Sequence, residues 1–179
     1  MSEQPERVDA YLVCGGKYHD FDYARLQILE KLGAHEQVRV GVGSDYSDLD
    51  AIDRATFLVS YTCDVRPAPE EQAAIADWVS AGGRWLALHG TNAILDQTER
   101  GFAAPREYGT WMELLGSQFI AHPPIAPYTV EISNGEHPLV TGIEPFDTDD
   151  ELYLMELHDA DQLVPLLHTH YSGEARGFA

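Results

Sequence analysis

Basic residues are scarce in this chain. Its 179 residues include 11 Lys and Arg against 30 Asp and Glu, which gives a formal net charge of −19. Nucleic acids and anionic membrane surfaces are bound mainly through Lys and Arg, so the composition argues against both as partners. Solubility in water or in salt is a sufficient reason for the acidity itself.

Cysteine and long apolar runs are scarce as well. Cys14 and Cys63 are the two cysteines, too few for a disulfide framework. Each lies near the end of a predicted strand, where a buried small hydrophobic side chain is a better interpretation than a redox pair. The sequence contains no run of 18 apolar residues, and its start has no apolar core of signal-peptide length. We therefore expect a cytoplasmic protein.

The strong short motifs of metal and phosphate sites are missing too. The sequence contains no CxxC pair and no HExxH, the spacings that most clearly indicate zinc. It also lacks GxGxxG and GxxxxGK[ST], the glycine patterns that cradle nucleotide phosphates. Any functional site has to be assembled from residues that are far apart in the sequence.

The length and the hydrophobic content of 44% are sufficient for one domain with a proper core. We expect this domain to span residues 7–179, after a disordered lead-in at residues 1–6. The sequence stops directly after a predicted strand, an unusual place for a sheet domain to finish. We therefore expect that it is a fragment or lacks its last part.

The apolar periodicity predicts an α/β fold. Strands are predicted at 7–14, 37–42, 55–61 and 84–88, and helices at 22–32 and 69–79. This alternation is typical of parallel crossovers and of a doubly wound, mostly parallel sheet with helices on both faces. Further along, we expect a helix at 105–115, a strand at 127–133 and short strands at 151–155 and 162–168.

The segment RWLALHGTN, residues 84–92, is the most informative part of the chain. Its apolar run ends abruptly at His89-Gly90. A buried strand that ends at a polar residue and a glycine places a side chain at the lip of a sheet in α/β enzymes. Hydrolases and amidotransferases hold a Ser or Cys nucleophile at this corner. Because a histidine stands here, we exclude Ser or Cys acylation at this corner.

Three loops are expected to meet at the carboxyl edge of the sheet. They are residues 15–20, residues 62–66 and the loop that begins at His89. Ligands of open α/β sheets bind outside the carboxyl ends of the strands, where the strand order switches. If the strand order is 2-1-3-4, His19 and His89 open on one crevice.

The second half of the chain adds further candidates. His122 precedes two prolines, which fix its direction, and Glu151 begins an apolar stretch that turns it inward. The other acidic residues of 147–151 are interpreted as a solvated loop, and His137 as a simple turn cap. His168 and His170 share one face of a strand, which indicates little by itself.

Five segments in this order, GGKYHDF, GGRWLALHGTN, ELLGSQFIAHPP, EHPLVTGIEPF and DELY, resemble the ThuA-like (trehalose utilization) family. The resemblance covers residues 8–168. It implies a flavodoxin-like fold similar to class I glutamine amidotransferases, without their cysteine nucleophile, and a link to the catabolism of disaccharides and keto-sugars.

By position, the resemblance implies functional roles for His19, His89, His122 and Glu151. Ser117 departs from the family pattern, because a second glycine usually follows Leu115-Gly116. Our leading hypothesis is an enzyme that isomerises or cleaves keto-glycosides. It assigns catalysis to His89, Glu151 and His19, substrate binding to His122, Tyr18, Asn92 and Tyr153, and a divalent, zinc-like metal to His19, His89 and His122.

We consider two alternative functions. A non-catalytic module that binds a sugar or serves in assembly is the main alternative, since a fold does not determine a function. A glutamine amidotransferase is disfavoured, because it needs a Cys at the corner that holds His89. The family resemblance also implies a homo-oligomer, and the expected partner is a small-molecule sugar.

Overall fold

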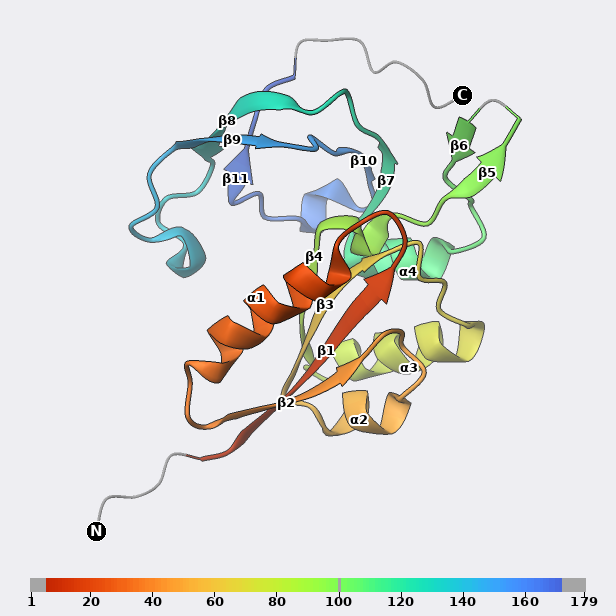
Figure 1. Cartoon of the computed structure of the whole chain (residues 1–179), viewed down its shortest axis with the longest axis vertical. Coiled ribbons are helices and arrows are strands. Elements are labelled where there is room, and N and C mark those ends of the chain that lie inside the picture. Colours follow the sequence, from red (N-terminus) through yellow and green to blue (C-terminus); the bar gives the residue numbers. More distant parts are fainter. Residues whose placement is uncertain (1–5, 100, 172–179) are drawn as a thin grey trace.

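A four-stranded parallel sheet forms the first half of the molecule. The computed structural model describes residues 6–99 and 101–171. Its main sheet consists of β1 (Val8–Gly16), β2 (Val38–Gly43), β3 (Phe57–Cys63) and β4 (Arg84–Leu88). The strand order is β2-β1-β3-β4 and every pair is parallel (Figure 1), which confirms the predicted strands and meets the condition under which His19 and His89 share a crevice.

The two central strands carry the core. Leu12, Val13 and Cys14 of β1 are fully buried, because both faces of the strand are covered. Val13 belongs to the cluster that includes Ile52 and Ile75, whereas Leu12 and Cys14 pack against the helix that follows β1. Cys14 and Cys63 are both buried and unpaired by disulfide, as small hydrophobic side chains would be.

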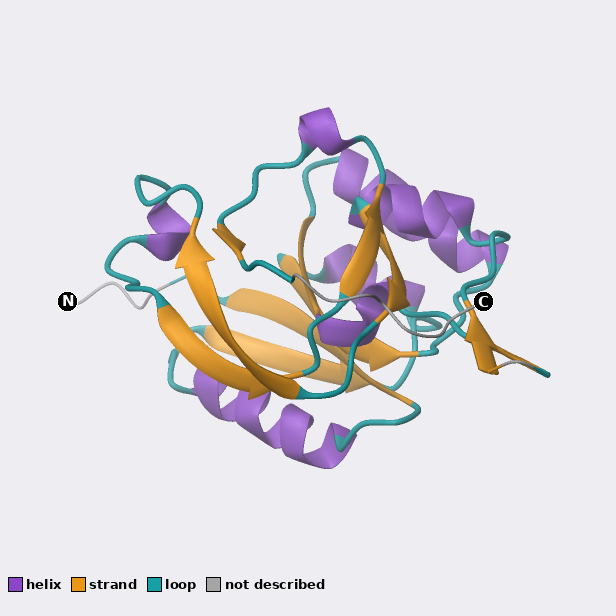
Figure 2. Ribbon diagram, turned by 90° about the horizontal axis from the view of Figure 1, so that it is seen from above, coloured by secondary structure: helices purple, strands orange, loops and turns teal. Residues whose placement is uncertain are grey.

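Helices cover the sheet on both sides of the strands (Figure 2). α1 (Phe21–Gly33) begins where the Asp20 side chain accepts a hydrogen bond from the backbone N–H of Tyr23. α3 (Pro69–Ser80) begins with proline and two glutamates, as predicted. The sequence analysis missed α2 (Leu49–Arg54), whose six residues are too short for a visible helical period.

The second half consists of short elements that lie over the carboxyl ends of the parallel strands (Figure 1). They include the 3₁₀ turn His89–Asn92, the hairpin of β5 (Asp96–Thr98) and β6 (Gly101–Ala103), and α4 (Gly109–Leu115). β7 (Ser117–Ala121) pairs antiparallel with β10 (Leu154–Leu157), and β8 (Ala126–Ile132) pairs antiparallel with β9 (Phe146–Asp150) and β11 (Leu167–His168). The 3₁₀ turns Pro138–Val140 and Ala160–Gln162 complete the described elements.

Several predictions for this half need correction. The helix expected at 105–115 begins only at Gly109, although it ends at Gly116 as predicted, with the glycine at a φ of 73°. Residues 151–153 lie between β9 and β10, and the strand expected at 162–168 is reduced to Leu167–His168. β7 and β9 were missed, because pairing with distant partners and not local periodicity makes these segments strands.

The architecture is a mixed α/β fold. Since only four strands form the parallel sheet and the others form small antiparallel sheets, the doubly wound arrangement of the whole chain stays a prediction. The lead-in at 1–6, apart from residue 6, and the last residues, 172–179, lie outside the described part. Among the described residues, no helix combines the length and the apolar character needed to span a membrane.

Candidate functional site

Backbone strain is concentrated at the carboxyl edge of the parallel sheet. Four described residues other than glycine have a positive φ: Tyr18, Asp64, His89 and Asp159. Tyr18 lies two residues after β1, and Asp64 and His89 directly follow β3 and β4. A side chain held in this region costs about 1–3 kcal/mol, and such residues cluster at functional sites. The strained residues therefore lie mainly at the edge of the sheet where the sequence predicts the functional site.

His89 occupies the corner at the end of β4 with a φ of 49°. The next residue has to be glycine, because a Cβ on Gly90 would lie 2.8 Å from the carbonyl oxygen of Thr62 and 3.2 Å from the sulfur of Cys63. The chain can therefore turn sharply against β3 and leave the imidazole at the lip of the sheet. This corner is the one that the sequence predicts.

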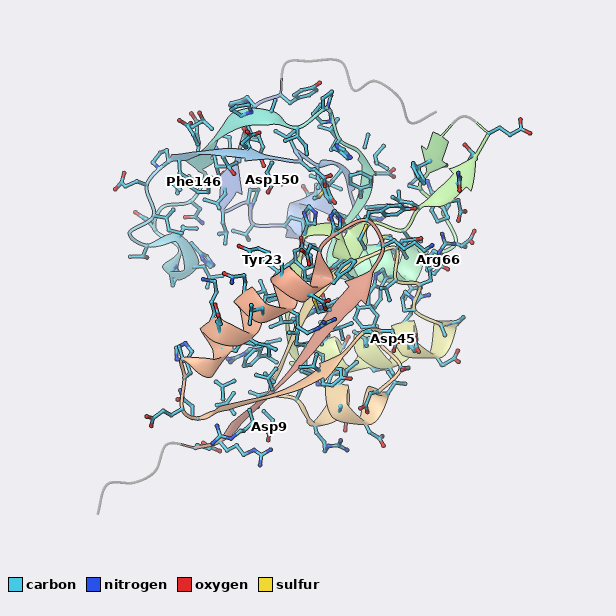
Figure 3. The ribbon with its side chains drawn as sticks, viewed as in Figure 1. Asp9, Tyr23, Asp45, Arg66, Phe146 and Asp150 are labelled. Atoms are coloured by element: carbon cyan, nitrogen blue, oxygen red, sulfur yellow. The ribbon has the colours of Figure 1, made fainter. Side chains whose placement is uncertain are left out.

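Three ionisable side chains meet at this corner, and we call them the His19–His89–Glu151 centre. The rings of His19 and His89 have their centroids 4.5 Å apart, which confirms that both open on one crevice. Glu151 approaches from the segment between β9 and β10, with Oε2 at 3.5 Å from Nε2 of His89. Figure 3 shows Asp150, the preceding residue, above the parallel sheet.

Two tyrosines enclose the imidazole of His89. Tyr61 of β3 stacks on the ring at a centroid distance of 5.4 Å, and Tyr153 stacks on it at 4.6 Å. The Tyr153 hydroxyl also lies 3.1 Å from Nε2 of His89. The sequence analysis missed Tyr61, whose signal is its place two residues before the end of the neighbouring strand β3.

The surroundings favour the neutral forms of His89, Tyr153 and Cys63. Burial lowers the pKa of His89, the charge of His19 lowers it further, and Glu151 opposes both. Burial, Cys63 and Glu151 raise the pKa of Tyr153. Burial, assisted by Asp64 and Glu151, raises the pKa of Cys63 to about 12, so this residue is a thiol and not a reactive thiolate.

His122 lies beside the centre. Its Nε2 is 3.9 Å from Oε1 of Glu151, and its Nδ1 lies 2.8 Å from the carbonyl oxygen of Pro123. Asn92 is buried and donates to the Ser117 hydroxyl at 2.8 Å, while its Oδ1 has no hydrogen-bond partner among the described residues. Tyr18 is exposed at the rim, edge-on to Phe102.

The other histidines of the analysis lie elsewhere. His137 caps the turn that follows it, since its Nδ1 accepts from the backbone N–H of Leu139, as predicted. His168 pairs with Glu131 across β8 and β11, and its ring meets that of His170. Glu131, His168 and His170 form a second, exposed cluster away from the crevice.

Two cavities adjoin the centre and share Glu151 and Tyr153. The larger, of about 420 Å³, has polar side chains in its wall, among them His89, Thr91, Asn92, Ser117 and Asp150. The smaller, of about 190 Å³, lies between Tyr18, Phe102 and Phe119 and also meets His19 and His122. A third cavity, of about 410 Å³, is lined by His19, Tyr61, His89 and Glu151, so a ligand can reach the centre from three cavities.

The donor set of the centre suits a divalent metal. One ligand atom from each of His19, His89 and Glu151 lies within 4.8 Å of the others. Two imidazoles and a carboxylate are a typical set for catalytic zinc, which keeps a fourth position open. Of the three histidines expected to hold the metal, His19 and His89 belong to this group, and its third ligand atom comes from Glu151.

A comparison with protein families shows which family the chain belongs to. The sequence matches the family described as ThuA, trehalose utilisation, over residues 10–177. The chain belongs to the ThuA family. This confirms the resemblance found in the sequence, whose motifs supply His19, His89, His122 and Glu151. The search of curated proteins finds no match.

Solved structures with the same fold include ThuA-like proteins. A putative ThuA-like protein of Parabacteroides merdae has a TM-score of 0.72 at 13% identity, over 97% of this chain and 72% of that one. One from Bacteroides uniformis has a TM-score of 0.66 at 17% identity, over 87% of this chain. The match spans 64% of the length of the Bacteroides protein.

A third solved structure has a weaker likeness. A putative GMP synthase component from Thermoplasma acidophilum has a TM-score of 0.51 at 12% identity, over 87% of this chain and 71% of that one. At these identities the likenesses describe the fold alone. They are consistent with the glutamine amidotransferase-like fold that the sequence predicts.

Proposed function

We propose that this ThuA-family chain is an enzyme of carbohydrate catabolism that acts on a keto-glycoside. The observation that supports it is the convergence of His19, His89 and Glu151, with the Tyr153 hydroxyl, at the carboxyl edge of the sheet. The substrate is a small sugar, and the reaction is an isomerisation or an elimination. We also propose that the protein is cytoplasmic and forms a homo-oligomer.

The chemistry follows from the acidity of a C–H bond next to a ketone. The Glu151 carboxylate takes this proton, and the electron pair moves to the carbonyl oxygen. The Tyr153 hydroxyl and the neutral imidazole of His89 donate hydrogen bonds to the charge that develops there. In isomerisation this proton is delivered to the former carbonyl carbon, and the proton of the neighbouring hydroxyl moves to the former carbonyl oxygen, so that the carbonyl shifts by one carbon. In elimination the adjacent C–O bond breaks, and the proton passes to the departing oxygen.

A divalent metal fits the same residues. His19, His89 and Glu151 would hold it, and when bound it would polarise the sugar carbonyl as a Lewis acid. Glu151 would then serve as a ligand, while Tyr153 and His122 would bind and orient the substrate. The metal-free and metal-bound forms of the proposal share the same ketone substrate.

The alternative is a sugar-binding or assembly module without catalysis. Under that alternative each histidine would be held separately by a backbone group. Beside the centre His122 has this property, since its Nδ1 lies 2.8 Å from the carbonyl oxygen of Pro123, and His137 has it further away, at the backbone N–H of Leu139. The contacts of His19, His89 and Glu151 with one another favour the enzyme. The neutral Cys63 thiol disfavours a glutamine amidotransferase.

The decisive test measures the turnover of 3-keto-disaccharides by the purified chain and by His89→Ala, together with the metal content of both. We expect turnover by the unmodified chain and a loss of at least about 100-fold in the variant. Equal turnover by both proteins would remove His89 from catalysis. Sugar binding without turnover, and without loss in the variant, would favour the module.

A further inference from the structure

The smaller cavity beside the His19–His89–Glu151 centre has no role in the proposed reaction. It encloses about 190 Å³. Its apolar wall comes from four separate elements or loops and consists of Cys63, Ala93, Leu95, Phe102 and Phe119. Its other wall is formed by the ionisable residues of the crevice, including Glu151. A group bound in this cavity would therefore touch the centre directly.

The apolar wall contains few hydrogen-bonding groups. Cys63 is a neutral thiol whose side chain packs with Ala93 and Phe119. The ring of Phe119 meets that of Tyr153 at a centroid distance of 4.4 Å, and the rings of Tyr18 and Phe102 meet edge-on at 5.8 Å at the rim. Hydroxyl groups placed against this apolar wall would lose their water without gaining partners, whereas an aromatic ring would be enclosed.

The larger cavity has the opposite character. Its wall contains the side chains of Thr91, Asn92, Ser117 and Asp150, which offer donors and acceptors to several hydroxyl groups. The Oδ1 atom of Asn92 is buried and has no hydrogen-bond donor in the described part of the chain. Glu151 and Tyr153 line both cavities, so a molecule that occupies both would lie across these two residues.

We infer that the preferred substrate is a glycoside with an apolar, aromatic aglycone. The sugar ring occupies the larger cavity, the aglycone occupies the smaller one, and the bond between them lies at Glu151. Phe102 and Leu95 act as specificity-determining residues. This inference rests on the proposed function for its sugar half, while the apolar subsite stands on the geometry of its own wall.

A binding experiment tests the subsite without any reaction. Calorimetry compares phenyl β-glucoside with methyl β-glucoside, neither of which has a ketone. We expect the phenyl compound to bind at least about tenfold more tightly to the unmodified chain, because its ring is buried. Phe102→Ala should remove most of this preference. Leu139→Ala, on an exposed residue outside both cavities, should retain it.

Equal affinity for the two glucosides, or no binding of either, would overturn the inference. So would a preference that Phe102→Ala leaves unchanged. Turnover of the 3-keto forms of phenyl glucoside and of trehalose separates this result from the proposed function. A phenyl preference in binding without turnover of either would contradict the reaction and keep the subsite. Turnover of both 3-keto compounds at equal efficiency, without a preference for the phenyl glucoside in binding, would support the reaction and contradict the apolar subsite.

Discussion

The Tyr153 hydroxyl lies 3.1 Å from Nε2 of His89, and the two rings stack with their centroids 4.6 Å apart. Tyr61 covers the other side of the imidazole. His89 is therefore held in position by two aromatic rings and one hydroxyl, at a corner where its own backbone is strained. Such support from neighbouring side chains keeps a functional group in one geometry.

Replacing Tyr153 with phenylalanine should separate the hydroxyl from the ring. We expect Tyr153→Phe to lower kcat for keto-glycosides about 10- to 100-fold, because the stacking remains while the hydrogen bond is lost. Steady-state kinetics with thermal denaturation measures both effects. Tyr23→Phe, on the exposed face of α1, is the control. An unchanged kcat in Tyr153→Phe would remove the hydroxyl from the reaction.

Metal binding should depend on the His19–His89–Glu151 centre. We expect zinc to bind the unmodified chain, and His89→Ala to weaken this binding by more than the roughly 10–100-fold that an outer-shell change costs. Titration with a competing chelator measures the affinity.

The exposed cluster of Glu131, His168 and His170 provides the matched control for this titration. His168→Ala should leave the tight site intact, because the two clusters are separate. The opposite pattern, with zinc affinity lost in His168→Ala and kept in His89→Ala, would contradict the proposed metal site.

Gly90 should not tolerate a side chain. A Cβ there would lie 2.8 Å from the backbone carbonyl of Thr62, which cannot move without disturbing β3. We expect Gly90→Ala to reduce the free energy of unfolding by about 1–3 kcal/mol, as overpacking does. Denaturant unfolding measures it. Gly33→Ala is the control, since an added Cβ there meets nothing within 4 Å; equal effects would argue against the tight corner.

Asp64 should make stability depend on pH. Its carboxylate is almost fully buried and accepts hydrogen bonds from Lys17 at 2.6 Å, from Arg66 at 3.1 Å and from the backbone of Leu95. Burial alone would raise the pKa of Asp64, but these hydrogen bonds and the charge of Arg66 outweigh it and hold the pKa below 3.8. Figure 3 shows Arg66 on the side of the β5–β6 hairpin, where it also binds Asp96.

Because the pKa of the folded state is lowered, the charged Asp64 stabilises the fold above pH 3.8 and loses this effect as the pH falls further. We expect Asp64→Asn to cost about 1–3 kcal/mol at pH 7 and clearly less at pH 3. Urea unfolding at both values measures the difference. Asp22→Asn, on an almost fully exposed side chain, should cost little at either pH. A cost for Asp64→Asn that does not depend on pH would contradict the assignment.

The first half of the fold could be predicted from local sequence patterns. The strands at β1, β3 and β4 are apolar runs with clear ends, and Asp20, Pro69 and Gly116 mark helix boundaries by their own capping chemistry. In the second half, β7 pairs with β10 and β8 with β9 over long separations. A strand made by a distant partner has no local period of its own, which is why the sequence misplaced these elements.

The sequence by itself determined the four strands of the parallel sheet and the place of His89 at its corner, because both depend on neighbouring residues and on the sharp turn that Gly90 permits. Only the tertiary structure decided which groups surround His89. Tyr153 is 64 positions away in the chain, and Glu151 reaches the corner because the segment between β9 and β10 folds back over the sheet. Contacts over such separations depend on packing of the whole chain, which no local pattern encodes.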